Sequence, residues 1–172
     1  MDVNSKLKRV ELLLLDVDGV LTDGSIIYSD TGDEIKPFNV KDGLGLRLLM
    51  AAGIKIAIVT GRKSQALLRR CADLGITHIF DAVKDKESIL DGILRQLGIA
   101  PENTAFIGDD LPDLKLMKRV GFAVAVADAN KAVQDRADMV TAAAGGKGAV
   151  RELCETILKA NGIWNDVLEQ YN

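Results

Sequence analysis

The stretch that decides the fold spans residues 12–24 and reads LLLLDVDGVLTDG. Its four leucines form an apolar run that is too short for a helix and is typical of a strand buried on both faces of a parallel sheet. The run ends at Asp16, Asp18 follows two positions later, and Gly19 permits a tight turn directly after them. In open α/β sheets ligands bind outside the carboxyl ends of the strands, so this stretch predicts a strand that presents two carboxylates to a ligand.

On both sides of this stretch, short β-favouring runs alternate with segments of helical periodicity. The expected core strands cover residues 11–15, 55–60, 78–80, 105–107, 122–126 and 139–140. The expected helices cover residues 44–52, 64–74, 86–97, 111–120, 131–136 and 149–160. This alternation predicts a doubly wound, Rossmann-like α/β fold with a mostly parallel sheet and helices on both faces.

Residues from about 24 to 42 interrupt the alternation. Apolar residues at 26–28 precede the turn-forming run SDTGD at 29–33 and a second set of apolar residues, which predicts a β-hairpin inserted after the first strand. Neither the interval from Asp16 to Thr60 nor that from Thr60 to Asp109 has room for a folded cap domain. The tail at about 162–172 predicts a short amphipathic helix whose apolar face needs a partner. We therefore expect one domain over residues 1–172, without a cap.

Composition excludes several functions. The chain carries 22 Lys plus Arg against 25 Asp plus Glu, a net charge of −3, and has no long basic run, which argues against nucleic acid or an anionic membrane surface as partner. The apolar run at 12–15 is far too short for a signal-peptide core or a membrane span. Two cysteines cannot form a disulfide framework, so a reducing, cytoplasmic location is expected.

Reactive side chains follow four of the predicted strands. They are Asp16 and Asp18 after the first, Thr60 after the second, Lys84 and Lys86 after the third, and Asp109, Asp110 and Asp113 after the fourth. Crowding Asp16, Asp18 and Asp109 together is strongly repulsive unless a divalent cation neutralises them, and an all-oxygen site suits Mg²⁺. We take these three as the metal residues. Asp113 has two alternative roles, holding the water shell of the metal or a loop amide.

This arrangement predicts a phosphatase. A carboxylate beside Mg²⁺ attacks phosphorus in line, and a second one two residues on protonates the leaving oxygen, so Asp16 is the expected nucleophile and Asp18 the expected acid. Thr60 supplies a hydroxyl hydrogen bond, and a lysine balances the charge. Spacing alone does not separate Lys84 from Lys86. In the second half-reaction Asp18 takes a proton from the water that attacks the aspartyl-phosphate.

These pieces resemble the four motifs of the haloacid dehalogenase superfamily of phosphohydrolases. The motifs match here at residues 16–20, 60–62, 86 and 108–113, in the same order and over most of the chain. The resemblance implies that Lys86, at the start of a helix, is the phosphate-facing lysine. Because the predicted site has no cap, a small substrate needs walls from another subunit to exclude water, which predicts an oligomer.

In detail the chain resembles one capless family, the 3-deoxy-D-manno-octulosonate 8-phosphate phosphatases of lipopolysaccharide precursor synthesis, which are tetramers whose hairpins form a central barrel. The matching stretches are residues 14–24, 38–43, 58–62 and 145–152. The resemblance implies Mg²⁺-dependent hydrolysis of that ester. The implied substrate-binding residues are Asp18, Asn39, Val40, Lys41, Asp42, Gly43, Arg47, Arg62, Arg70 and Lys86. Arginine suits a sugar acid phosphate because it binds carboxylate and phosphate bidentately.

Alternatives remain open at this stage. Residues 80–82 read FDA and depart from the glutamine-glycine pair of many members, so a phosphatase for a nine-carbon sialate or deaminosialate 9-phosphate is the nearest alternative. A non-catalytic oligomerisation module of the same fold is a second, against which the presence of Asp18 and Lys86 argues. A receiver-type signalling domain carries its acidic residues in a different order. The glycine-rich loop at 145–148 is expected to act near a neighbouring active site, as is the tail.

Overall fold

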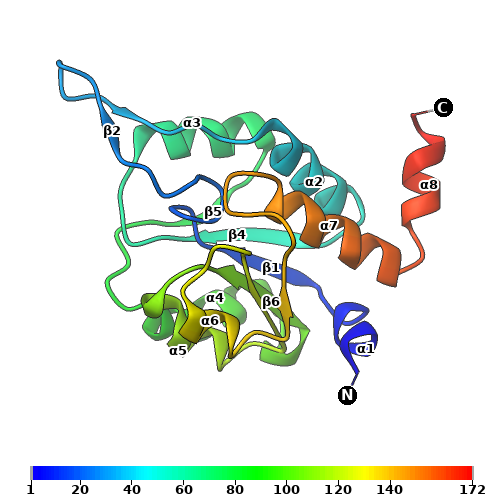
Figure 1. The fold of residues 1–172 in the computed structure, drawn as a ribbon. Helices are drawn as coiled ribbons and strands as arrows, with labels where there is room; N and C mark the ends of the chain where they lie inside the picture. The colour runs from blue at the N-terminus through cyan, green and yellow to red at the C-terminus, as the bar shows by residue number, and fades with distance from the viewer. Residues whose placement is uncertain (1, 172) are drawn as a thin grey trace.

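A six-stranded parallel sheet in the order β5-β4-β1-β6-β7-β8 forms the centre of the computed structural model, which describes residues 2–171 (Figure 1). The strands are β1 (Leu12–Leu15), β4 (Lys55–Val59), β5 (His78–Phe80), β6 (Thr104–Gly108), β7 (Phe122–Ala125) and β8 (Met139–Val140). The four leucines of β1 are fully buried, and β1 pairs in parallel with β4 on one side and β6 on the other. The predicted buried central strand is therefore confirmed.

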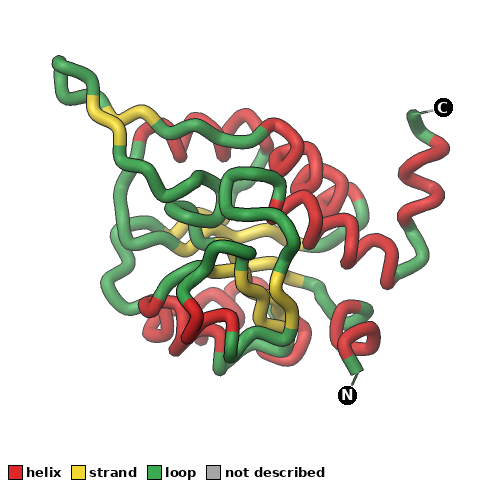
Figure 2. Tube along the Cα trace, viewed as in Figure 1, coloured by secondary structure: helices red, strands yellow, loops and turns green. Residues whose placement is uncertain are grey.

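Helices cover both faces of the sheet, as Figures 1 and 2 show. One face carries α2 (Val40–Ala51), α3 (Gln65–Leu74) and α7 (Ala149–Ala160), and the other carries α4 (Lys86–Leu97), α5 (Leu114–Met117) and α6 (Lys131–Gln134). Two 3₁₀ turns, η1 (Pro101–Asn103) and η2 (Leu111–Asp113), flank β6. The doubly wound α/β fold is confirmed, and no cap domain is present in residues 2–171.

Several helices differ from the sequence prediction, and the helix expected at 131–136 already ends at Gln134. Helix α2 begins at Val40 rather than at residue 44, because the side chain of Asn39 accepts a hydrogen bond from the backbone of Lys41 at 2.8 Å and caps the helix. The helix expected at 111–120 is split into η2 and α5. Helix α5 ends at Met117. Gly121, which follows it, packs so closely against Glu102 that a Cβ on Gly121 would lie 2.1 Å from the carbonyl oxygen of Glu102. The sequence also did not predict α1 (Val3–Leu7).

The predicted hairpin is present and projects from the body of the molecule (Figure 1). It consists of β2 (Ile27–Tyr28) and β3 (Glu34–Ile35), which pair antiparallel. Its apolar side chains at Ile26, Ile27, Tyr28 and Ile35 are exposed to solvent. The hairpin thus leaves apolar surface uncovered in the single chain.

The tail forms the predicted helix α8 (Trp164–Glu169), which docks on α7 of the same chain. The ring of Trp164 lies 5.7 Å from the guanidinium carbon of Arg151 and 5.2 Å from Nζ of Lys159, both cation–π distances. Val167 is buried. Across residues 2–171, none of the helices combines the length and the apolar character needed to span a bilayer.

Candidate active site

Strand ends at one edge of the sheet bring the predicted catalytic side chains together. Asp16 follows β1, Thr60 follows β4, Lys86 begins α4 and Asp109 follows β6. All four line one cavity of about 450 Å³. The cavity is also lined by Asp18, Gly24, Gly61, Arg62, Val83, Lys84, Asp110 and Pro112. Because parallel strands direct their carboxyl ends to the same edge, residues far apart in the sequence meet here.

A buried ammonium group lies between two carboxylates in this cavity. Nζ of Lys86 is 2.6 Å from Oδ2 of Asp16 and 2.7 Å from Oδ1 of Asp113. Lys84 lines the same cavity but is exposed. Of the two lysines that spacing could not separate, it is therefore Lys86 that the fold pairs with Asp16.

Asp113 organises the loop after β6. Its Oδ2 accepts hydrogen bonds from the backbone of Asp109 at 2.9 Å and of Asp110 at 3.4 Å, while its Oδ1 accepts from Lys86. The side chain is 1% exposed. Of the two roles left open for Asp113, the structure shows the loop-amide role, and it adds the contact with Lys86, which the sequence did not predict.

Negative charge exceeds positive charge in the cavity. Burial raises the pKa of Asp16 to about 6, helped by the nearby charge of Asp113 and opposed by Lys86. Burial likewise raises the pKa of Asp109 to about 7, with further contributions from Asp16 and Asp113. One ammonium group therefore does not compensate these carboxylates, and their mutual repulsion favours a bound cation.

The carboxylates fit Mg²⁺. Asp16, Asp109 and Asp113 each place one carboxylate oxygen within 4.8 Å of the others, an all-oxygen donor set of the kind that this cation prefers. Both oxygens of Asp113 accept hydrogen bonds, and Oδ1 of Asp16 accepts from the backbone of Val17 while its Oδ2 contacts Lys86. Asp109 therefore has the least engaged carboxylate of the three. The predicted third member, Asp18, is not in this group, and its carboxylate faces the hairpin instead. The metal role expected for Asp18 stays a prediction, and Asp18 lines the same cavity.

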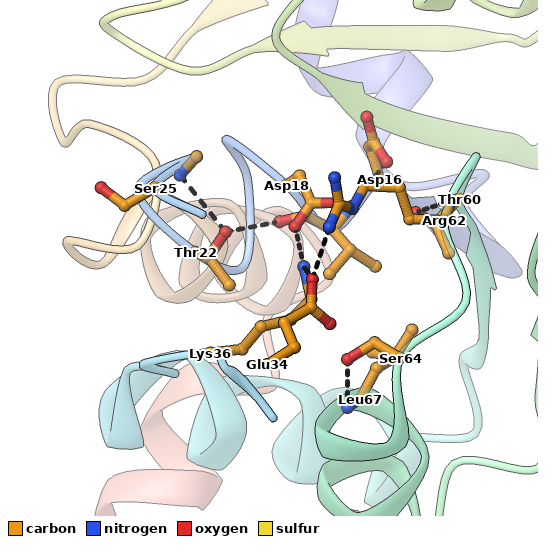
Figure 3. Close-up of polar contacts among 12 residues, drawn as sticks. Asp16, Asp18, Thr22, Ser25, Glu34, Lys36, Thr60, Arg62, Ser64 and Leu67 are labelled. Atoms are coloured by element: carbon orange, nitrogen blue, oxygen red, sulfur yellow. Dashed lines mark hydrogen bonds and ion pairs between the residues drawn. The ribbon is translucent and has the colours of Figure 1, made fainter. Parts of the chain in front are cut away.

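The carboxylate of Asp18 belongs to a separate charged cluster, drawn in Figure 3. Its Oδ1 accepts a hydrogen bond from Lys36, and Nε of Arg62 lies 3.6 Å from its Oδ2. Arg62 also donates to Glu34 at 2.7 Å, and its Nη2 lies 3.3 Å from the hydroxyl oxygen of Tyr28. Sequence reasoning missed Lys36 and Glu34, because a charged residue in a hairpin is ordinarily solvated and no spacing marks these two.

Close backbone packing shapes the loop after Asp18. Gly19 has φ +86°, and a Cβ there would lie 2.1 Å from Oδ2 of Asp109. The glycine-rich loop at 145–148 packs on the same turn, since Gly146 donates to the carbonyl of Val20 at 2.9 Å and a Cβ on Gly145 would lie 1.8 Å from the carbonyl oxygen of Gly19. This loop therefore buttresses the catalytic loop of its own chain.

Within one chain, the predicted substrate residues divide into two groups. Lys86, Arg62 and Asp18 line the cavity of Asp16, as described. Apart from the buried Asp42, the others border two further hollows, one of about 450 Å³ at Asn39, Val40 and Lys41 and one of about 370 Å³ at Val40, Gly43, Arg47 and Arg70.

Several members of this second group make structural contacts. Asp42 is buried and accepts a hydrogen bond from the backbone of Arg151 at 2.8 Å, at the start of α7. Arg47 donates to the carbonyl of Asp73 at 2.9 Å, and Arg70 donates to that of Asn39 at 3.3 Å. The fold of one chain does not bring these side chains to Asp16.

Comparison with known proteins places this site in context. The sequence profile of the haloacid dehalogenase-like hydrolases matches residues 75–153. The chain is 50% identical over 161 residues to 3-deoxy-D-manno-octulosonate 8-phosphate phosphatase KdsC of Escherichia coli K12, an alignment that covers 94% of this chain and 86% of the relative.

Solved structures agree over nearly the whole chain. The 3-deoxy-D-manno-octulosonate 8-phosphate phosphatase of Moraxella catarrhalis, in complex with magnesium ion, phosphate ion and KDO, superposes with a TM-score of 0.96 at 44% identity and covers 98% of this chain and 97% of its own. The cobalt-bound Haemophilus influenzae enzyme gives a TM-score of 0.90 at 45% identity, with 92% and 93% covered.

Proposed function

Because the chain belongs to the 3-deoxy-D-manno-octulosonate 8-phosphate phosphatase family of haloacid dehalogenase-like hydrolases, we propose that it hydrolyses this ester to 3-deoxy-D-manno-octulosonate and phosphate. The reaction is Mg²⁺-dependent, proceeds through an aspartyl-phosphate and serves lipopolysaccharide precursor synthesis. The observation that carries the proposal is the carboxylate of Asp16, held 2.6 Å from Lys86 beside Asp109, in a chain half identical to an enzyme of that name.

In the first half-reaction a carboxylate oxygen of Asp16 attacks phosphorus and the P–O bond to the sugar breaks. Asp18 donates its proton to the leaving sugar oxygen, while Lys86 and the hydroxyl of Thr60 stabilise charge on the phosphoryl oxygens. Mg²⁺ held by Asp16 and Asp109 would neutralise charge on the carboxylates and the phosphate. The products of this step are the free sugar acid and phosphorylated Asp16.

In the second half-reaction water attacks the phosphorus of the aspartyl-phosphate. The carboxylate of Asp18 takes a proton from that water, as microscopic reversibility requires of the group that acted as the acid. The P–O bond to Asp16 then breaks, inorganic phosphate leaves and the carboxylate of Asp16 is restored.

Substrate selection is assigned to arginine. Arg62 lines the cavity and presents a planar guanidinium suited to the sugar carboxylate. Residues 39–43, Arg47 and Arg70 lie outside this cavity in one chain, so we assign their substrate contacts to an assembled oligomer in which subunits complete one another's sites. The exposed apolar side chains of the hairpin support a homotetramer formed through the hairpins. Two buried, unpaired cysteines support a cytoplasmic location.

An assay of phosphate release tests the proposed function directly. The wild type is supplied with 3-deoxy-D-manno-octulosonate 8-phosphate and with nine-carbon sialate and deaminosialate 9-phosphates, in Mg²⁺ and in EDTA, with Asp16→Asn as the blank. We expect Mg²⁺-dependent preference for the eight-carbon ester. Preference for a nine-carbon ester would keep the mechanism and change the substrate, and no turnover of any ester would favour the oligomerisation module.

A further inference from the structure

Four charged side chains form a closed ring at the base of the hairpin (Figure 3). Going round the ring, Asp18 contacts Lys36, Nζ of Lys36 lies 3.5 Å from Oε1 of Glu34, Glu34 accepts from Arg62 at 2.7 Å, and Nε of Arg62 lies 3.6 Å from Asp18. Acidic and basic groups alternate, and each oxygen of Asp18 faces a different cation. The ring joins the loop after β1 to β3 and to the loop after β4.

Lys36 makes the tightest contact with Asp18. It donates a hydrogen bond to Oδ1, whereas Nε of Arg62 is too far from Oδ2 for a hydrogen bond. The side chain of Lys36 is 2% exposed, and burying an ammonium group is costly unless it is paired. Its buried position therefore requires the carboxylates it meets, and the position of Asp18 is set in turn by Lys36.

Glu34 fixes the two cations of the ring. Although burial acts to raise the pKa of Glu34, hydrogen bonds from Ser64 and Arg62 and the charge of Lys36 hold it below the usual value. Glu34 therefore stays ionised and contacts both Lys36 and Arg62, the two cations that also face Asp18. The ammonium group of Lys36 is thus held between the carboxylates of Glu34 and Asp18.

We propose that Lys36 is a positioning residue that holds the carboxyl group of Asp18 in place for proton transfer to the leaving sugar oxygen. This inference rests on the proposed function, since Asp18 is the acid of that mechanism. As the P–O bond to the sugar breaks, the proton passes from Asp18 to the bridging oxygen, and Lys36 exchanges no proton. The hairpin, whose apolar strands face solvent, thereby supplies a residue that acts through Asp18.

Leaving-group dependence tests this role. A well-placed acid matters most for poor leaving groups, so the effect of Lys36→Met should grow along a series of aryl phosphates as the pKa of the departing phenol rises, and be largest for the sugar ester. We compare kcat/KM, which covers the steps through departure of the alcohol, for wild type, Lys36→Met, Lys36→Arg and the exposed control Lys118→Met.

We expect Lys36→Met to lose about tenfold more activity on the sugar ester than on p-nitrophenyl phosphate, a part of the 10²–10⁴-fold that a placed acid contributes. Lys36→Arg should recover most of the loss, and Lys118→Met should match the wild type. The inhibition constant of inorganic phosphate should stay within about twofold, because the acid does not bind the phosphoryl oxygens. Activity on p-nitrophenyl phosphate also reports that each variant is folded.

Two outcomes would overturn the inference. An equal loss on every ester would make Lys36 a structural residue, and a weakened inhibition by phosphate without leaving-group dependence would make it a binding residue. A wild type that hydrolyses aryl esters but no sugar ester would contradict the proposed substrate instead, and the aryl series would still test Lys36 on its own.

Discussion

Nζ of Lys86 lies 2.6 Å from Oδ2 of Asp16, and this one contact joins the nucleophile of the proposed reaction to the start of α4. The ammonium group is nearly fully buried and also contacts Asp113. Burial opposes its charge, but the two carboxylates raise the pKa of Lys86 overall. Lys86 is therefore charged and balances two buried carboxylates in the same cavity as Asp109.

Replacing Lys86 by Met should destabilise the protein by about 3 kcal/mol in EDTA, because removing one partner leaves buried carboxylates uncompensated. Part of the loss should return with Mg²⁺, which supplies the missing positive charge. Urea unfolding at neutral pH measures both effects. Lys84→Met, in the same cavity but exposed, is the matched control and should change stability by less than about 0.5 kcal/mol. Equal stability of the two variants would contradict this role of Lys86.

Stability without metal should fall as the pH rises. The pKa of Asp109 is raised to about 7 from an ordinary value of 3.8, so between these values the folded protein binds more protons than the unfolded chain. The free energy of unfolding in EDTA should thus decrease from about pH 5 to pH 7 and level off above. Asp16, with its pKa raised to about 6, contributes in the same direction.

Thermal unfolding in EDTA across this range measures that slope. Asp109→Asn should make the slope shallower, because the substituted side chain does not titrate and only the contribution of Asp16 remains. Stabilisation by Mg²⁺ should be larger at pH 8 than at pH 5, since protons compete with the cation at lower pH. A wild type whose stability rises over the same window in EDTA would show that these carboxylates are not protonated in the folded state.

Gly145→Ala should lower both stability and turnover. The added Cβ would lie 1.8 Å from the carbonyl oxygen of Gly19, a backbone atom that moves only if the catalytic loop moves. We expect a loss of about 1–3 kcal/mol and a reduced kcat, because Gly19 directly follows Asp18. Gly92→Ala is the matched control, since it has open space inside α4 and should stabilise the helix. An unchanged kcat in Gly145→Ala would argue against a role of the loop at 145–148 in supporting the catalytic loop.

Ile27→Asp should weaken the proposed tetramer. Ile27 is 42% exposed on the hairpin, and a carboxylate there would be buried against other copies if the hairpins assemble. Light scattering after size-exclusion chromatography should show a smaller species for Ile27→Asp. Val3→Asp alters a residue that is 46% exposed on α1 and should leave the assembly unchanged. An identical mass for both variants would exclude the hairpin as the interface.

Local sequence sufficed for the architecture and for the residues that converge on the cavity. The leucine run at β1 is apolar enough to demand burial on both faces, and Asp16 ends it, so parallel topology places Asp16 and Asp109 at the same edge. The catalytic motifs are defined by the residues that directly follow each strand, and these residues can be read from the neighbouring sequence. Hydrophobic periodicity could not predict the start of α2, because that start depends on a single capping hydrogen bond to the side chain of Asn39.

Tertiary packing decided the partners of the charged groups. The burial of Lys36 against Asp18 depends on how the hairpin folds back over the catalytic loop, and the contact of Asp113 with Lys86 depends on how α4 meets the loop after β6. Likewise, packing alone places the glycine-rich loop at 145–148 against Gly19 of its own chain. Periodicity and capping act between near neighbours along the chain, whereas the energy of an ion pair depends on distance and burial, which exist only once the layers have packed.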